Sequence, residues 1–192
     1  MITGSKFKFI GGAVCLDFIN TVSGRIGGTR YRIVRDKLAS TQDLKIWSEL
    51  AGIPSARPSP DLLARALAFR ESLYRICKSV VEDSTPSKAD LARLNRELAI
   101  AHSHERLTYS ENAFALTSDH SPDRILWSIA RSATDLLASE DRTLLRQCGG
   151  HECGWMFLDT SRNRSRQWCD MRICGNRAKA RKFRQRLRTN TS

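Results

Sequence analysis

The stretch WCDMRICGNRAKARKFRQR, residues 168–186, places two cysteines directly before a run of arginines and lysines. Cys169 and Cys174 have four residues between them, and seven basic side chains follow between positions 177 and 188. Thiols at short spacing are typical of metal sites, and a basic run is typical of a segment that binds a polyanion. The adjacency predicts a metal site that fixes the start of a cationic helix.

A second pair of cysteines, Cys148 and Cys153, precedes the first pair. Both pairs follow the pattern CxxxxC, and fifteen residues separate them. Zinc prefers four soft ligands in a tetrahedral arrangement, and a site with four thiolates has no open position for catalysis. We therefore expect one structural Zn²⁺ per chain, bound by Cys148, Cys153, Cys169 and Cys174. The ion would supply cohesion that a short segment with few large apolar residues cannot obtain from burial.

The cysteines also allow two other interpretations. Two disulfides would suit a secreted protein, but nothing in the sequence indicates secretion. Four buried thiols would need apolar surroundings, whereas the flanking residues are polar and rich in glycine. His151 could replace one thiolate as a ligand, yet four thiolates already suffice, so we expect it beside the site or in solvent.

The loop between the two pairs, GWMFLDTSRNRSRQW, predicts a hairpin. An apolar run at 155–158, a turn-like DTSRN and Trp168 on the return would place two tryptophans beside the metal. The second pair would then open a helix. The arrangement resembles a treble-clef finger, with a knuckle, a hairpin and a helix that starts at the last ligands.

Residues 177–188 predict a helix whose apolar stripe, Ala180, Phe183 and Leu187, can dock on the finger. Repulsion between like charges disfavours such a helix in isolation, so a polyanion would stabilise it. A solvated tail is the alternative, but the run adjoins the expected zinc site and is continued by the arginines of SRNRSR. The predicted nucleic-acid contacts are Arg162, Arg164, Arg166, Asn176, Arg177, Lys179, Arg181, Lys182, Arg184, Arg186 and Arg188.

The charge of the chain is unevenly distributed. Its 192 residues include 32 Lys plus Arg and 20 Asp plus Glu, for a net charge of +12, and residues 148–192 hold 11 of the basic and 3 of the acidic residues. This distribution indicates a polyanion-binding segment attached to a near-neutral body. No apolar run approaches the roughly 20 residues that span a bilayer, and MITGSKFKFIGG lacks a signal-peptide core. We expect a cytoplasmic protein with no membrane partner.

The first 140 residues predict a mainly helical body. Ser59 precedes Pro60 at a helix start, and apolar residues then recur at helical spacing to position 80. Further helices are expected behind Thr41, behind a capping box from Ser87 to Asp90, and behind Ser121. Residues 14–19 predict a helix or a buried segment.

Two stretches break the helical pattern. Residues 106–118 alternate apolar and polar side chains around Glu111 and Asn112 and predict a hairpin, to which KFKFI at 6–10 could add a third strand. The fold class is therefore α+β. It comprises a mainly helical N-terminal domain, residues 1–140, with a small antiparallel sheet, and a treble-clef-like zinc finger with a basic C-terminal helix, residues 141–192.

These residues are familiar from a known family. CGWMFLDTSRNRSRQWCDMRICGNRAKARKFRQR resembles the CGNR zinc finger, named for the tetrapeptide at 174–177, and FKFIGGAVCLDFINT at 7–21 is similar to the start of the ABATE domain. That domain precedes this finger in bacterial proteins regarded as stress-induced transcription regulators. All four family cysteines have counterparts here, so the resemblance implies the zinc site. The knuckle CGGHEC departs from the expected Pro- or Asp-containing loop, and residues 22–140 match in order and length only.

Three functions compete. The first, which we predict, is a transcription regulator whose finger binds duplex DNA while the N-terminal domain senses an unidentified small-molecule effector or forms a homodimer. The second is an RNA-binding or ribosome-associated zinc protein. The third is an enzyme with a site in the N-terminal domain, where Asp17, Asn20 and Thr21 could line a small-ligand pocket. DFINT can equally be a helix end with local caps, and we expect no enzymatic activity.

Overall fold

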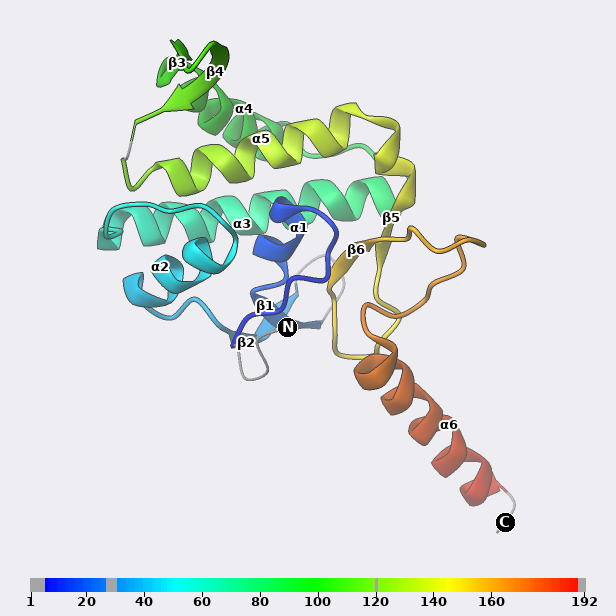
Figure 1. Cartoon of the computed structure of the whole chain (residues 1–192). Helices are drawn as coiled ribbons and strands as arrows, with labels where there is room; N and C mark the ends of the chain where they lie inside the picture. Colours follow the sequence, from blue (N-terminus) through cyan, green and yellow to red (C-terminus); the bar gives the residue numbers. More distant parts are fainter. Residues whose placement is uncertain (1–5, 27–30, 120, 190–192) are drawn as a thin grey trace.

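The computed structural model describes residues 6–26, 31–119 and 121–189. The first five residues of the stretch MITGSKFKFIGG lie outside the described residues. The fold is α+β, with helices that pack around α3 and three two-stranded antiparallel sheets (Figure 1). In chain order the elements are α1 (Val14–Ile19), β1 (Val22–Ile26), β2 (Arg32–Asp36), α2 (Thr41–Leu50), α3 (Pro60–Val81), α4 (Lys88–Ser103), β3 (Glu105–Ser110), β4 (Ala113–Ser118), α5 (Arg124–Ala138), a 3-10 turn (Glu140–Leu144), β5 (Leu145–Gln147), β6 (Met156–Leu158), a π-helical turn (Met171–Gly175) and α6 (Asn176–Thr189).

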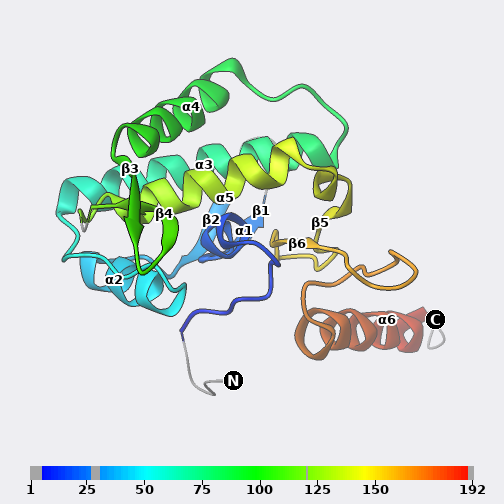
Figure 2. The ribbon, with the colours of Figure 1, turned by 45° about the horizontal axis from the view of Figure 1, so that its top comes forward.

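The long helix α3 begins as its sequence predicts. Ser59 caps it by accepting a hydrogen bond from the Leu62 backbone N–H at 3.1 Å, and Pro60 occupies the first turn. The buried side chains of α3 include Phe69 and Leu73, on the face that packs against α1 and the rest of the core. Helix α4 contacts both α3 and α5 (Figure 2). No helix in the described part of the chain is long and apolar enough to cross a membrane.

The other predicted helices are confirmed, although three of their starts differ, and α5 has Asp123 as its N-cap in place of the predicted Ser121. The capping box at Ser87 does not form, because Asp90 instead accepts two hydrogen bonds from Arg75 at 2.5 and 2.9 Å. In α2 the cap is Ser40, one residue before the predicted Thr41, and it accepts from the Asp43 N–H. A carboxylate in reach of a guanidinium forms the stronger, charge-assisted bond, so tertiary contact overrides the local motif.

The hairpin β3–β4 is confirmed, and its turn residues Glu111 and Asn112 have φ of 49° and 66°, as a two-residue turn between twisted strands requires. The predicted third strand is wrong, because residues 6–10 form no strand. This segment runs against α2 instead. Phe9 stacks on Trp47, and Lys6 pairs with Asp43 at 2.6 Å.

A second ribbon, β1–β2, has no counterpart among the sequence predictions. It is fixed to α3 by ion pairs: Arg70, 1% exposed, donates to both oxygens of Asp36 at 2.8 and 2.6 Å. Arg25 pairs with Glu71 and lies over the ring of Tyr74 at 4.1 Å. Burial opposes ionisation of Asp36, but the hydrogen bonds and charge of Arg70 outweigh it, so the pKa of Asp36 is lowered. The ribbon therefore has a defined position on the body.

Candidate metal centre and nucleic-acid interface

The first two cysteines flank a knuckle between short strands. β5 pairs with β6, with Leu145 opposite Leu158, and beyond the strands the Cys148 N–H donates to the Trp155 carbonyl at 2.8 Å. The predicted hairpin between residues 155–158 and Trp168 is therefore wrong. β6 pairs across the knuckle with the strand that precedes Cys148, and this leaves residues 159–167 as a loop.

Asp159 organises that loop. Its side chain is buried and accepts from the N–H and hydroxyl of Ser161, at 3.0 and 2.5 Å, and from the Arg166 N–H at 2.8 Å. The hydrogen bond from the Ser161 hydroxyl is the main cause of the lowered pKa of Asp159. These local bonds replace the ladder that a second hairpin strand would have formed.

The four cysteines of the two pairs converge. Their sulfur atoms all lie within 4.8 Å of one another, with Cys153 Sγ 3.5 Å and Cys174 Sγ 3.7 Å from Cys169 Sγ. Four sulfurs placed tetrahedrally at about 2.3 Å from one ion would be roughly 3.8 Å apart. The Cys169 N–H also donates to Cys148 Sγ at 3.3 Å, which favours a thiolate there. The donor set and spacing therefore fit zinc.

The four thiols shift one another's pKa values. Hydrogen bonds from Cys153 and Cys169 lower the pKa of Cys148, while the same contacts raise the pKa of Cys153 and Cys169. These hydrogen bonds favour a thiolate at Cys148 over one at Cys153 or Cys169. A bound divalent cation would lower the pKa of every thiol in the cluster, because it stabilises all four thiolates together.

Gly150 lets the sulfurs approach. A Cβ at this position would lie 3.1 Å from Cys153 Cβ, 3.3 Å from Cys174 Sγ and 3.5 Å from Cys148 Sγ, so a larger residue would crowd the ligands. Trp155 and Trp168 both pack on the cysteine cluster, as their spacing predicts. The neighbouring His151 is exposed and outside the converging group.

The finger is joined to the body by hydrogen bonds of the side chains of Asn20 and Trp155 and by hydrogen bonds between backbone groups. Asn20 donates to the Met156 carbonyl at 2.8 Å and accepts from the Met156 N–H at 2.9 Å. Trp155 Nε1 donates to the Val22 carbonyl at 2.7 Å, and the Gly24 N–H donates to the Cys153 carbonyl at 3.2 Å. Leu145 and Met156 belong to the main hydrophobic core. Body and finger consequently share one core.

The residues considered for a small-ligand pocket lie at this junction. Asn20 pairs with Met156, and the Thr21 hydroxyl donates to the Phe18 carbonyl at 2.8 Å. Asp17 accepts from the Gly11 N–H at 2.8 Å. Burial raises the pKa of Asp17 to about 6. All three side chains are buried and engaged in hydrogen bonds that hold the fold together.

The basic helix α6 begins immediately after Cys174, through the π-helical turn. Asp170 accepts from the Arg172 N–H at 2.8 Å at the start of that turn, and Asn176 donates to the Arg172 carbonyl at 3.0 Å. Beyond its first turn the helix extends away from the body (Figures 1 and 2). The predicted docking of its apolar stripe is wrong, because Phe183 is 63% exposed. The stripe lies past the end of the finger surface.

Most predicted nucleic-acid contacts are accessible. Arg162 and Arg164 are exposed on the 159–167 loop. Arg166 differs, because it donates to the carbonyls of Trp168 and Cys169 and lies over the Phe157 ring at 4.4 Å, so it supports the finger. The exposed positions on α6 are Asn176, Arg177, Lys179, Arg181, Lys182, Arg184, Arg186 and Arg188.

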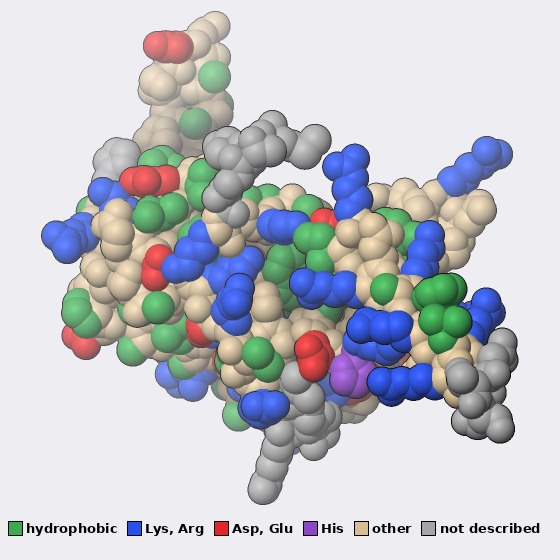
Figure 3. All heavy atoms as spheres, turned by 90° about the horizontal axis from the view of Figure 1, so that it is seen from below, with side chains coloured by type: hydrophobic (Ala, Val, Ile, Leu, Met, Phe, Trp, Pro, Cys, Tyr) green, Lys and Arg blue, Asp and Glu red, His purple; other side chains and the backbone are tan. Residues whose placement is uncertain are grey.

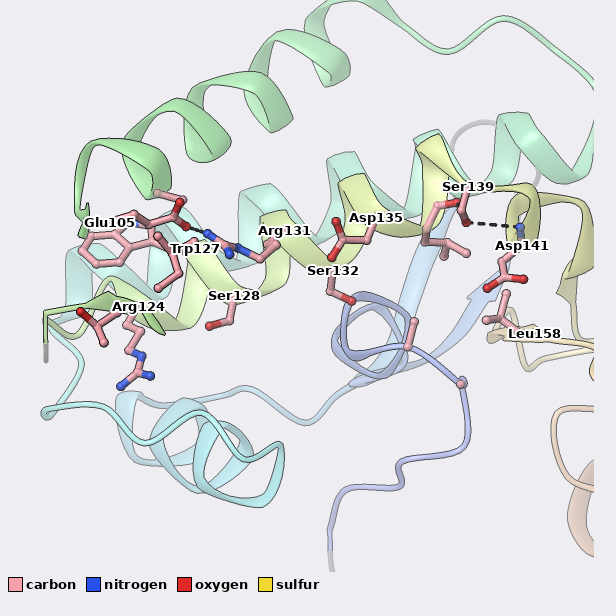
Figure 4. Close-up of a pocket in the computed structure, with 16 residues that line it drawn as sticks. Glu105, Arg124, Trp127, Ser128, Arg131, Ser132, Asp135, Ser139, Asp141 and Leu158 are labelled. Atoms are coloured by element: carbon pink, nitrogen blue, oxygen red, sulfur yellow. Dashed lines mark hydrogen bonds and ion pairs between the residues drawn. The ribbon is translucent and has the colours of Figure 1, made fainter. Parts of the chain in front are cut away.

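Sequence reasoning missed a groove of about 680 Å³ along α5 (Figure 4). Glu105 and Arg131 form an ion pair at one end, and Asp141 and Leu158 lie at the other. Trp127 lines the groove, and its buried indole N–H has no hydrogen-bond partner in the described part of the chain. Ser128, Arg131 and Asp135 recur at helical spacing, and this polar stripe on an otherwise apolar helix was the available signal.

Two family models match the chain. The ABATE model, described as "Putative stress-induced transcription regulator", matches residues 12–140, and the CGNR zinc finger model matches residues 144–187. A search of curated proteins found no match. The second match contains all four converging cysteines. The chain therefore belongs to the ABATE family and carries a CGNR zinc finger at its C-terminal end.

Proposed function

We propose that this protein is a DNA-binding transcription regulator in which one Zn²⁺ per chain holds α6 in position for contact with DNA phosphates. The observation that carries the proposal is the position of α6. It starts at the last thiol of the metal centre, stands clear of the body, and exposes seven basic and no acidic side chains. A structural metal would fix only the base of the helix, so the cations beyond it remain available to a partner.

The dimensions of α6 favour duplex DNA as that partner. A helix of 14 residues is about 21 Å long and, with side chains, about 10–12 Å wide, which matches the roughly 12 Å major groove of B-DNA. Double-stranded RNA has a deep, narrow major groove that does not admit a helix. RNA loops remain the second candidate, because exposed arginines also bind single-stranded segments.

The N-terminal domain would supply sensing or assembly. The groove along α5 offers a site for a small polar effector, and the unpartnered Trp127 N–H supports a hydrogen-bond acceptor there. The hairpin β3–β4 exposes Leu107, Tyr109, Phe114 and Leu116, which supports a homodimer contact. We assign no catalytic activity, because Asp17, Asn20 and Thr21 serve in structural hydrogen bonds. A DNA-binding role would place the protein in the cytoplasm.

Binding measurements at several salt concentrations test the proposal. Fluorescence anisotropy of the full chain with a labelled duplex should show tight binding that weakens steeply with salt, by about 0.9 in log-log slope for each phosphate contacted. Replacement of both Arg181 and Arg184 by alanine should weaken binding and reduce that slope. Preference for a structured RNA over the duplex would favour the second candidate, and no binding to either would refute a nucleic-acid role. Elemental analysis should find one zinc per chain.

A further inference from the structure

A cleft of about 410 Å³ lies between the β1–β2 ribbon and the finger. Its walls come from both parts of the chain, and the basic side chains that line it are Lys8, Arg35, Lys37, Arg177 and Arg181. Two carboxylates, Glu152 and Asp170, also line the cleft. The cleft therefore carries an excess of positive charge to which the body and α6 both contribute.

The surrounding surface is strongly basic as well. Figure 3 views the molecule from below Figure 1, and Lys and Arg side chains gather there from the middle of the face to its α6 side. Acidic side chains are sparse between them. A continuous basic face of this kind produces the electrostatic potential expected at a polyanion site.

Most of the cations in the cleft are uncompensated. Arg35, Arg177 and Arg181 are exposed, and none of them forms an ion pair within residues 6–26, 31–119 and 121–189. Lys8 differs, because it reaches across the cleft to Asp170 at 3.3 Å. Opposing carboxylates would neutralise most of these groups in a purely structural cluster, whereas among the described residues Lys8 alone of these five cations forms an ion pair.

Lys37 lies beside Trp155. Its Nζ lies 5.0 Å from the ring centroid of Trp155, and its side chain is half-buried. Burial lowers the pKa of Lys37, and the charges of Lys8 and Arg35 lower it further. An anion in the cleft would relieve both effects.

Hydrogen bonds fix the backbone of the β1–β2 ribbon where it lines the cleft. The Lys37 N–H donates to the Thr21 carbonyl at 3.0 Å, and the adjacent Asp36 is held by Arg70. On the other strand the Gly24 N–H donates to the Cys153 carbonyl, so the ribbon is bonded directly to the knuckle. Because the backbone that carries Arg35 and Lys37 is already fixed, binding would need to order only their side chains.

We infer that the β1–β2 ribbon and the first turns of α6 form a composite clamp for the phosphate backbone of a nucleic-acid strand, with Arg35 and Lys37 opposite Arg177 and Arg181. This inference rests on the proposed nucleic-acid function and assigns part of the interface to the N-terminal domain. The strand in the cleft would border the groove that the outer turns of α6 enter. The ribbon would fix the orientation of α6 on the duplex, since phosphate contacts set register and orientation.

Anisotropy titrations of the zinc-loaded full chain with a 20-base-pair duplex test the clamp. The variant replaces Arg35 and Lys37 by alanine. A matched control replaces Lys88 and Arg96, two exposed cations on α4, which lies far from α6. The ribbon variant should lose on the order of tenfold in affinity at low salt, and its log-log salt slope should fall by about 1.8, while the control stays near wild type.

A conservative variant separates charge from packing. Lys37→Arg keeps the positive charge over Trp155 and should keep the wild-type salt slope, whereas loss of slope in this variant would contradict the clamp. Zinc content and melting temperature show whether each variant folds.

The outcomes distinguish the two levels of the proposal. If α6 variants weaken binding but the ribbon variant behaves like its α4 control, the clamp is wrong and the proposed function stands. If wild-type protein binds neither duplex nor RNA, the proposed function itself fails.

Discussion

The two halves of the finger relate to the body in opposite ways. In the half from Leu145 to Asp159, Leu145 and Met156 belong to the main core of the body, and Asn20 is bonded to the backbone of Met156. The other half, α6, contacts the rest of the chain at its first turn and leaves Phe183 63% exposed. The first half is therefore integrated with the body, whereas α6 leaves most of its surface exposed, and the four cysteines lie between the two.

Loss of the metal should have the largest effect, because the centre joins the two halves. Cys169→Ser removes the thiol whose sulfur lies 3.5 Å from Cys153 Sγ and 3.7 Å from Cys174 Sγ. We expect loss of zinc and a fall in the free energy of unfolding of more than about 4 kcal/mol. Elemental analysis and urea unfolding measure both. His151→Ala is the control and should keep its zinc, whereas retention of one zinc in Cys169→Ser would contradict the four-thiolate centre.

Disruption of the junction should rank second. Asn20→Ala leaves the buried N–H and carbonyl of Met156 without their partner. We expect a loss of about 3 kcal/mol in the free energy of unfolding. Asn95→Ala, at an exposed position on α4, is the matched control and should change stability little. Equal unfolding curves for the two variants would show that the hydrogen bonds between Asn20 and Met156 do not hold the finger to the body.

A change in the opposite direction is expected at Asp17, which accepts from Gly11 next to that junction. Burial raises the pKa of Asp17 to about 6 from 3.8, so the folded state keeps a proton that the unfolded state loses. The stabilising contribution of the protonated acid is complete below pH 3.8 and is lost as pH rises through about 6. Asp17→Asn keeps the acceptor oxygen and should raise the free energy of unfolding by about 2 kcal/mol at pH 7.

Urea unfolding between pH 4 and pH 7 checks this prediction. The difference between Asp17→Asn and wild type should shrink toward zero at the acidic end. A difference that does not vary with pH would show that the carboxyl group of Asp17 titrates normally.

The projecting half should give the smallest effect. Phe183→Gln should change the free energy of unfolding by less than about 0.5 kcal/mol, because the ring is mostly in solvent. A docked phenylalanine would instead cost about 3–5 kcal/mol on removal. Urea unfolding distinguishes these values. A fall of several kcal/mol in the free energy of unfolding would show that the apolar stripe of α6 is docked, as helical spacing predicts.

Local signals were sufficient for much of the fold. Ser59 with Pro60 gives the start of α3, the Glu111-Asn112 turn gives β3–β4, and the spacing of the four cysteines gives the metal ligands. Each depends on residues close in sequence or on the fixed geometry of one ion. For this reason the sequence alone predicted them.

Long-range contacts were not predictable in the same way. The strands β5 and β6 have three residues each, too few for an alternating pattern, and β1–β2 depends on ion pairs to α3. The role of Arg166 depends on the carbonyls it reaches. The pose of α6 was missed because a helical wheel gives an apolar face without showing whether a surface lies opposite it.

Because Asn20 pairs with the backbone of Met156, this finger cannot be exchanged for another zinc finger without loss of contacts to the body. A cut at residue 140 would leave Leu145 and Met156 without the surface that covers them, and the body would lose part of its own core. A finger transplanted from another protein would need backbone groups that satisfy Asn20 and Gly24 and an indole N–H, like that of Trp155, that reaches the Val22 carbonyl. The body and the finger should therefore stabilise each other, and each should be less stable when separated at residue 140.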